Sequence, residues 1–457
     1  MKTLYLFRWG GLLCSLIVSF SLKSHAQQSF SLKEAVDYGV KNNLNVNSSQ
    51  LDQAIAKARI GEIKASGLPQ VTVALGLSHT IKPQPFFLPP GLSFGGPAPA
   101  DPDEETALSL GGVRYSSNAV ANLNWLLFSN SYLLGLKAAK VYTELAVKNV
   151  TASKITVAEN IAKAYYGVLV NEERLSLLDV NVSRLDSLLR ETQVSNKEGV
   201  VEKLDVQRIE VQRNNLVTER QNVIRLQELA LILLKYQMGY PLNQNLVLTE
   251  KLAKIDLNEN TIQDVKRPFT YGDRIEYSTL QTQRVLQTID VENVRKSNMP
   301  TLSLAGNFGY FNGRQSIARF VTRPWLEAGS IGFNINVPVF DGFTRKYKLS
   351  QSRSNLLKVE NNIKLLEQSI DMQLSQAEIQ LRNYWFTLQE QRKNLELAEE
   401  VVRVTRVKYK EGVGANIEVI NAEASFREAQ TNYYTALYNA LVAKVDLDKA
   451  AGKLYSE

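Results

Sequence analysis

The chain has 457 residues, with 53 Lys and Arg against 46 Asp and Glu, which gives a formal net charge of +7 at neutral pH. One cysteine and two histidines exclude an internal disulfide framework and a cysteine- or histidine-based metal cluster, and they make an enzyme the least favoured class. The basic residues are spread along the chain rather than gathered in a block, so we expect a solvated surface and no nucleic-acid site.

The first 26 residues are typical of a secretory signal peptide. Lys2 and Arg8 precede an apolar run from Leu12 to Phe20, and small residues around Ala26 would allow cleavage before Gln27. The alternative is an uncleaved membrane anchor, but the apolar run is far shorter than the ~20 residues that span a bilayer. The mature chain is therefore expected to be exported.

Long proline-free stretches predict four long helices. Residues 103–240 and 339–457 contain no proline and are rich in residues that favour helices. The predicted helices span about 130–195, 202–238, 343–410 and 416–450. Small and aromatic residues recur at coiled-coil spacings in the last helix: Ala422, Phe426, Ala429, Tyr433 and Ala436. From the helices alone, a coiled-coil spacer without a channel is an equal alternative.

Four short segments alternate between apolar and polar residues, which predicts β-strands. They span about 70–81, 113–128, 301–311 and 330–340. Alternation over ~10 residues with uncharged polar residues opposite is typical of membrane-spanning barrel strands, although a soluble sandwich face alternates in the same way. Four strands cannot close a barrel, since the smallest barrels have about eight, and open sheet edges cannot face lipid. A barrel would therefore be shared between copies of the chain, and a dimer, a trimer or a tetramer would each satisfy this requirement.

The sequence repeats its landmarks at an interval of about 213 residues. Three pairs keep this interval to within one residue: Gly199 and Gly412, Gly239 and Gly452, and Phe128 and Phe340. So long an interval indicates the duplication of one supersecondary arrangement rather than a solenoid. We therefore expect a first repeat at 27–239, a mixed segment at 240–274 and a second repeat at 275–457. A Pro/Gly-rich loop at 82–105 is found only in the first repeat and is expected on the outside.

The junctions between strands and helices also repeat. Ser129 and Asp341 follow predicted strands and are suited to N-capping the helices that come next. Pro69 and Pro300 stand where a helix would end and a strand begin. Strands and helices are therefore expected to be continuous with one another.

The duplicated order of helix, strand, strand and helix, the Leu68-Pro69 and Met299-Pro300 steps, and the paired Gly199 and Gly412 turns resemble the TolC-like outer-membrane efflux family. The resemblance covers essentially the whole mature chain. It implies a mainly α fold with a small β part, in which long antiparallel coiled-coil helices form a periplasmic α-barrel. This α-barrel would be continuous with a four-strand contribution to a shared transmembrane β-barrel.

The same resemblance implies a function and partners. It implies a homotrimer in the outer membrane of a Gram-negative bacterium, in contact with outer-membrane lipid. This trimer would bind a periplasmic adaptor protein and an inner-membrane pump, and it would export small molecules such as drugs, toxic compounds or metal ions. No cofactor is expected.

The resemblance also supplies the candidate site, because the family's periplasmic tip closes the tunnel and receives the adaptor. The positions that match the tip are Gly199, Asp205, Tyr409, Gly412, Gly414 and Glu418. The carboxylates would bond helices or line the constriction, although a carboxylate in the first turn of a helix commonly serves the helix dipole alone.

Two positions of the second turn depart from the family's pattern. Gly414 stands where an arginine can stand, and Asn421 where a second inward carboxylate can stand. A gate latched by that arginine is therefore not expected. Asn416 follows the turn at a position suited to a helix cap.

Two other functional classes remain open. A duct for type I protein secretion would use the same tunnel with a different pump, and a periplasmic coiled coil without a channel would have a purely structural role. The sequence contains no Gly-rich phosphate loop, nucleophile elbow or metal-ligand spacing that would support an enzyme.

Overall fold

The computed structural model describes residues 29–82, 86–88, 106–108, 113–252, 269–314, 316 and 324–455. The expected signal peptide at 1–26, most of the expected loop at 82–105 and residues 253–268 of the expected mixed segment lie outside the described residues. The chain divides into two compact units, and each unit combines segments that are far apart in the sequence. We call them the helical unit and the sheet unit.

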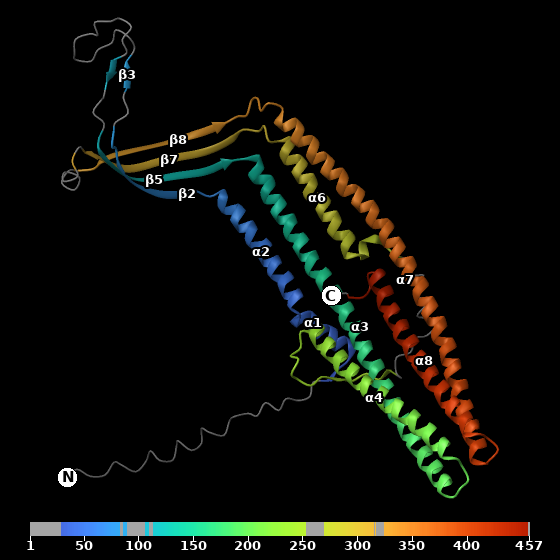
Figure 1. Ribbon diagram of the computed structural model, residues 1–457. Coiled ribbons are helices and arrows are strands. Elements are labelled where there is room, and N and C mark those ends of the chain that lie inside the picture. The colour runs from blue at the N-terminus through green and yellow to red at the C-terminus, as the bar shows by residue number, and fades with distance from the viewer. Residues whose placement is uncertain are drawn as a thin grey trace, which may run out of the picture. The chain divides into compact units, whose positions relative to one another are not determined.

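The helical unit combines the described residues up to Leu51 with Lys148–Ser278 and the residues from Leu365 on. Its elements are β1 (Ser29–Phe30), α1 (Leu32–Asn42), α4 (Lys203–Met238), β6 (Val247–Leu248), α8 (Asn416–Ala450), and large parts of α3 (Asn130–Lys197) and α7 (Thr344–Lys410) (Figure 1). These four long helices keep the predicted ranges to within two residues. Within the described ranges, none of the helices combines the length and apolar character that crossing a membrane requires.

A small layer formed by α1, β1 and β6, which we call the belt, packs on one face of α3. Strands β1 and β6 pair in parallel. Tyr165 of α3 is fully buried, and its hydroxyl donates a hydrogen bond to the backbone oxygen of Phe30 at 3.1 Å. Phe30 also stacks edge-on with Tyr38 and Tyr240, with ring centroids 5.4 and 5.9 Å apart. The belt therefore buries the side of α3 that carries Ile161 and Tyr165.

The sheet unit combines Asp52–Val147 with Thr279–Lys364. Its antiparallel sheet has the order β2 (Gln70–His79), β5 (Tyr115–Phe128), β7 (Thr301–Arg314) and β8 (Leu326–Asn336), so β5 and β7 join the two repeats (Figure 1). A short hairpin, β3 (Phe86–Leu88) and β4 (Thr106–Leu108), is paired separately. The unit also contains most of α2 (Leu44–Ser66) and α6 (Ile275–Arg295).

The register of the sheet sorts its two faces by polarity. Apolar residues and glycine lie side by side in one row across all four strands: Val71, Leu123, Gly306 and Ile331. The neighbouring row on the opposite face is uniformly polar: Thr72, Asn122, Asn307 and Ser330. The Asn307 side chain donates a hydrogen bond to the Ser330 hydroxyl at 3.1 Å. The sheet thus has an apolar face and a hydrogen-bonded polar face.

The junction after the last strand differs from the prediction. Strand β8 runs from Leu326 to Asn336, earlier than the predicted 330–340. Pro338 cannot donate to a strand ladder, which explains why the strand stops before it. Helix α7 begins at Thr344, after Gly342 and Phe343 with φ of 62° and 64°. Asp341 is thus not the residue immediately before the helix, but its carboxylate still accepts a hydrogen bond from the backbone N–H of Arg345 at 2.8 Å.

The predicted cap at the equivalent junction of the first repeat is confirmed. Ser129 lies directly before α3, and its hydroxyl accepts a hydrogen bond from the backbone N–H of Tyr132 at 3.3 Å. The two junctions therefore differ in the structure, although Phe128 and Phe340 are similarly placed in the sequence.

Candidate functional site

The turns that join α3 to α4 and α7 to α8 have the same backbone geometry. Gly199 and Gly412 both have a φ of 74°, as the predicted left-handed turns require. The N–H of Val200 bonds the oxygen of Ser195 at 2.9 Å, and the N–H of Val413 bonds that of Lys408 at 3.0 Å. These i to i−5 bonds satisfy carbonyls at the helix ends, as in Schellman turns.

The helices that follow the turns begin in the same way. The backbone N–H of Asp205 bonds the oxygen of Glu202 at 3.1 Å, and the N–H of Glu418 bonds that of Ala415 at 3.0 Å. Neither Glu202 nor Ala415 makes a side-chain cap bond. Asp205 and Glu418 therefore occupy equivalent first-turn positions.

The carboxylates of Asp205 and Glu418 nevertheless have different surroundings. Asp205 is half-buried, and its Oδ1 lies 3.5 Å from a guanidinium nitrogen of Arg208. Glu418 is exposed, and no ion pair engages it within the part of the chain that the structure describes. Glu418 is thus the carboxylate of this pair that is available to solvent and ions.

The expectation that Asn416 caps α8 is wrong. Ala415 occupies the cap position, and Asn416 is the first residue of the helix. Asn416 is buried instead, and its side-chain amide donates a hydrogen bond to the backbone oxygen of Asp205 at 3.2 Å. It therefore joins the start of α8 to the start of α4, which brings the two turns together.

Tyr409 forms a second link between the helix pairs. It is half-buried and packs against the apolar cluster that includes Leu188, Ile209 and Ile420. Its hydroxyl lies 3.5 Å from the hydroxyl of Thr192, which is fully buried. Thr192 donates its own proton to the backbone oxygen of Leu188 at 2.9 Å. Tyr409 must therefore be the donor in its contact with Thr192, because a threonine hydroxyl has one proton.

Gly414 lies close against the end of α7. Its N–H bonds the oxygen of Lys408 at 3.1 Å. A Cβ atom added at Gly414 would lie 3.1 Å from both Lys408 Cβ and the Tyr409 backbone nitrogen. A larger residue at this position would therefore require the turn to shift. Gly414 in place of the arginine that can stand here thus affects the backbone of the turn as well as its charge.

Sequence reasoning missed a charged cluster further from the turns. Glu423 of α8 is 9% exposed, and its carboxylate lies 2.9 Å from Nε of Arg406 on α7 and 3.8 Å from Nη1 of Arg184 on α3. Burial lowers the pKa of the Arg406 guanidinium, and Glu423 opposes that shift. The guanidinium of Arg184 also lies 5.4 Å from the ring centre of Phe426. Three helices thus share one buried carboxylate.

The sequence offered only part of the signal for this cluster. Glu423 lies between the predicted seam residues Ala422 and Phe426, so its burial could have been suspected. The partner arginines lie on other helices, and no spacing rule relates them to Glu423.

The described residues contain no group of three or more His, Cys, Asp and Glu side chains that could hold a metal ion. The site is instead a set of inter-helix contacts near two turns. Such contacts can hold helices together or let them separate, and they supply no reactive group.

Comparisons with known proteins agree with this architecture. Residues 280–453 match the family model of the outer membrane efflux protein. Nodulation protein T of Rhizobium leguminosarum bv. trifolii is 21% identical over 438 residues, covering 93% of this chain and 86% of that protein.

Solved structures show the same fold. The CmeC outer membrane channel of Campylobacter jejuni aligns with a TM-score of 0.70 at 16% identity, over 93% of this chain and 86% of that one. The open-state MtrE outer membrane channel of Neisseria gonorrhoeae aligns with a TM-score of 0.68 at 17% identity, over 92% and 88%. The second repeat thus matches the outer membrane efflux protein family model over residues 280–453, and almost the whole chain shares the fold of solved outer membrane channels.

Proposed function

We propose that this protein is an outer-membrane channel that exports small molecules as one component of a tripartite efflux system. Three copies would form the channel, with a periplasmic adaptor and an inner-membrane pump docked at the end that carries the Gly199 and Gly412 turns. The family match and the channels of the same fold support this proposal.

The observation that carries the proposal is the two-faced sheet with two open edges. The large apolar residues of the edge strands are strongly exposed, from Val71 at 66% to Leu75 at 80% in β2, and Ile331, Phe333 and Ile335 at 69–71% in β8. Lipid would cover this face, whereas the row through Asn122 and Asn307 would face water. The edges of β2 and β8 would then pair between copies, because unpaired backbone groups are not tolerated in lipid.

The helical unit supports assembly independently. Four large apolar residues of α7 recur at seven-residue intervals and are 58–65% exposed: Leu365, Met372, Ile379 and Phe386. A heptad stripe is the pattern of a helix that packs against a coiled-coil partner. A second copy of the chain would supply that partner. Of the numbers of copies that close the sheet, the family resemblance selects three, giving twelve strands.

The proposal is tested by expressing the protein in a Gram-negative host that lacks its own channel of this family. We expect the protein in the outer-membrane fraction as a stable trimer, forming conducting pores in planar bilayers and restoring resistance to small toxic compounds. A soluble monomer in the periplasmic fraction would refute it in favour of a structural coiled coil. Trimers that restore secretion of a protein substrate but never resistance would instead indicate a type I secretion duct.

Adjacent residues of β8 provide a matched pair of variants. Ile331→Lys places a charge on the apolar face, and we expect it to prevent trimer insertion, since a lysine at the bilayer midplane costs about 2–4 kcal/mol. Ser330→Lys places the same charge on the polar face, so this variant should assemble and show altered ion selectivity. Equal loss of trimers in both variants would contradict the assignment of the two faces.

A further inference from the structure

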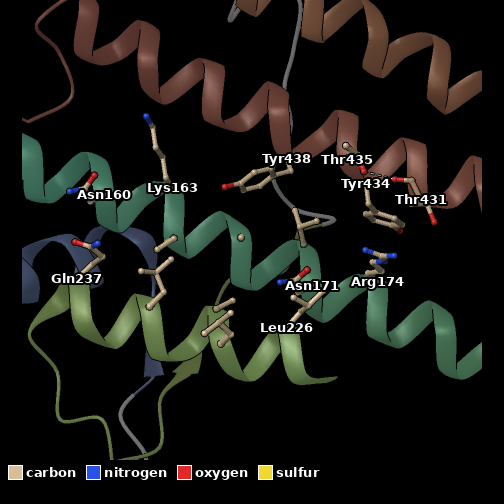
Figure 2. Close-up of a pocket in the computed structure, with 16 residues that line it drawn as sticks. Asn160, Lys163, Asn171, Arg174, Leu226, Gln237, Thr431, Tyr434, Thr435 and Tyr438 are labelled. Carbon is tan, nitrogen blue, oxygen red and sulfur yellow. Dashed lines mark hydrogen bonds between the residues drawn. The ribbon is translucent and has the colours of Figure 1, made fainter. Parts of the chain in front are cut away.

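The helical unit contains a groove that the export mechanism proposed above does not use. It has a volume of about 530 Å³ and is framed by α3, α4 and α8 (Figure 2). This volume falls within the ~300–1,000 Å³ that is usual for small-molecule sites. The groove lies within one chain and is separate from the turns.

The groove lies on the side of α3 away from the belt. Ile161 and Tyr165, which pack against the belt, lie within about 40° of each other around the helix axis. Gly167 and Val170, which line the groove, lie about 120° and 140° from the nearer of these two residues. The groove is therefore open on the face that the belt leaves uncovered. In the proposed trimer, where the belt surrounds the tunnel, this face is directed toward the interior.

The walls of the groove are apolar and aromatic. Leu226, Leu229 and Leu233 of α4 line one side and are 48%, 62% and 49% exposed. On the other side, Figure 2 shows the rings of Tyr434 and Tyr438 projecting from α8 toward α3. Flat aromatic molecules pack well between leucine side chains and tyrosine rings.

The cations that line the groove are already neutralised. Lys163 pairs with Glu159 at 2.8 Å and with Asp446 at 2.6 Å. Arg174 pairs with Glu219 at 2.9 Å. A charged ligand would gain little from cations held in such pairs, and burying its own charge would be costly. The pairs therefore favour an uncharged ligand.

Uncharged polar groups complete the lining. They are the amides of Asn160, Asn171 and Gln237 and the hydroxyls of Thr431 and Thr435. These groups can donate or accept hydrogen bonds, so a ligand with a hydroxyl or carbonyl group would be oriented by them. A few polar groups around apolar walls are typical of small-molecule sites.

Gly167 keeps the floor of the groove open. A glycine inside a helix costs about 1 kcal/mol relative to alanine, so the position calls for a local reason. A Cβ atom added here would lie 3.7 Å from Tyr438 Cε2, which is ordinary contact. Alanine would therefore fit, whereas a leucine would project into the space beside Tyr438.

We propose that this groove binds an uncharged, aromatic, amphipathic small molecule during its passage through the channel. The inference rests on the proposed export function, because that function places the groove on the tunnel wall. The groove would be a binding site on the tunnel wall for one chemical class of exported compound.

The test uses 4-(hydroxymethyl)benzophenone, an uncharged aromatic photoreactive probe, with the purified full-length trimer. After irradiation, mass spectrometry should find adducts on three tryptic peptides that carry groove residues: 164–174, 226–235 and 428–444. Peptide 383–392, which carries the exposed Phe386 of α7, controls for labelling of any apolar surface. Ionised 4-carboxybenzophenone should label the groove peptides at least fivefold less.

Three variants connect labelling to the groove. Gly167→Leu should reduce labelling of the groove peptides at least fivefold, and Gly167→Ala should retain it. Gly135→Leu is the matched control, since a Cβ atom at Gly135 of α3 meets nothing within 4 Å, and its labelling should equal that of the wild type. Trimer formation checked for each variant separates loss of the site from loss of the fold.

Three outcomes would overturn the inference: groove peptides labelled no more than peptide 383–392, equal labelling by the charged probe, or undiminished labelling in Gly167→Leu. The first outcome would also arise if a second copy covered the groove in the trimer. Any of these outcomes in a protein that still restores resistance would reject the groove and leave the export function intact. Specific labelling of the groove peptides in a protein that restores no resistance would support the groove as a binding site and reject the proposed export function.

Discussion

Tyr409 on α7 and Thr192 on α3 meet through their hydroxyl oxygens, 3.5 Å apart, with Tyr409 as the donor. This contact connects the two helix pairs close to their turns, where Asn416 also joins α8 to α4. If the turns close the resting channel, both contacts favour the closed state.

Tyr409→Phe removes this hydrogen bond and keeps the ring. A net hydrogen bond contributes about 0.5–1.5 kcal/mol, so we expect the ratio of open to closed channels to rise roughly two- to tenfold in single-channel recordings. Tyr409→Ala should have a larger effect because it also removes packing against the Leu188 cluster. Tyr384→Phe, at a more exposed tyrosine of the same helix, serves as the control. Wild-type conductance in Tyr409→Ala would exclude this residue from the gate.

Glu418→Gln tests the exposed carboxylate of the second turn. Three copies in a trimer would form an electronegative ring that attracts cations. We expect block of the channel by divalent and trivalent cations to weaken several-fold, measured as the blocking concentration in planar bilayers. Glu411→Gln removes another exposed carboxylate near the same turn and should change block much less. Unchanged block in Glu418→Gln would mean that this carboxylate only serves the helix dipole.

Glu423→Gln leaves Arg406 and Arg184 facing each other without a counter-charge. Because the carboxylate is 9% exposed, we expect a loss of about 2–3 kcal/mol in the free energy of unfolding, less than for a fully buried pair. Denaturant unfolding of the detergent-solubilised protein measures this loss. Glu400→Gln breaks a solvent-exposed pair with Arg403 and should leave the free energy of unfolding almost unchanged. Similar losses in the two variants would show that the buried cluster has no special role.

Gly199→Ala and Gly412→Ala test the shared geometry of the turns. A Cβ atom at either position meets nothing within 4 Å, so any cost comes from the left-handed backbone, at about 1–2 kcal/mol each. The two losses should be nearly equal and should add in the double variant. Gly135→Ala in α3 should instead stabilise the protein by up to about 1 kcal/mol. Clearly unequal losses would show that the turns differ energetically despite their common φ.

Glu159 gives stability a defined dependence on pH. Burial alone would raise the pKa of this carboxyl, but hydrogen bonds and charge from Lys163 and Lys449 outweigh burial and lower the pKa below 4.5. A carboxyl whose pKa is lower in the folded state contributes fully above about pH 4.5 and loses its contribution as pH falls through the lowered value. The difference in melting temperature between the wild type and Glu159→Gln should therefore be largest near neutral pH and shrink below pH 4. Glu172→Gln, at an exposed position of α3, serves as the control variant.

The sequence predicted the long elements well, because their patterns are local. The absence of proline and the abundance of helix-favouring residues placed α3, α4, α7 and α8 to within two residues. The turns at Gly199 and Gly412 were also predictable, because the left-handed backbone conformation that ends many helices is adopted most easily by glycine. The TolC-like resemblance, drawn from the order of these elements, is confirmed.

The predictions failed where the outcome depends on residues distant in the sequence. Asn416 follows its turn at a position where a cap is common. Its side chain is buried instead, because it donates a hydrogen bond to the backbone oxygen of Asp205 in the other repeat. Glu423 is paired by Arg184 and Arg406, which are brought together only by the packing of three helices. The end of β8 was misplaced because alternation continues past Asn336, where Pro338 prevents further pairing.

In the proposed outer-membrane channel, the open edges of β2 and β8 have a consequence for membrane insertion. A single copy that entered lipid would carry unpaired backbone groups along both edges, at several kcal/mol each. Copies must therefore associate before or during insertion, and the rate of insertion should rise steeply with the amount of newly exported protein. A copy with a defective edge would trap normal copies in incomplete assemblies, so a mutant allele of this kind would be dominant over the wild type in the same cell.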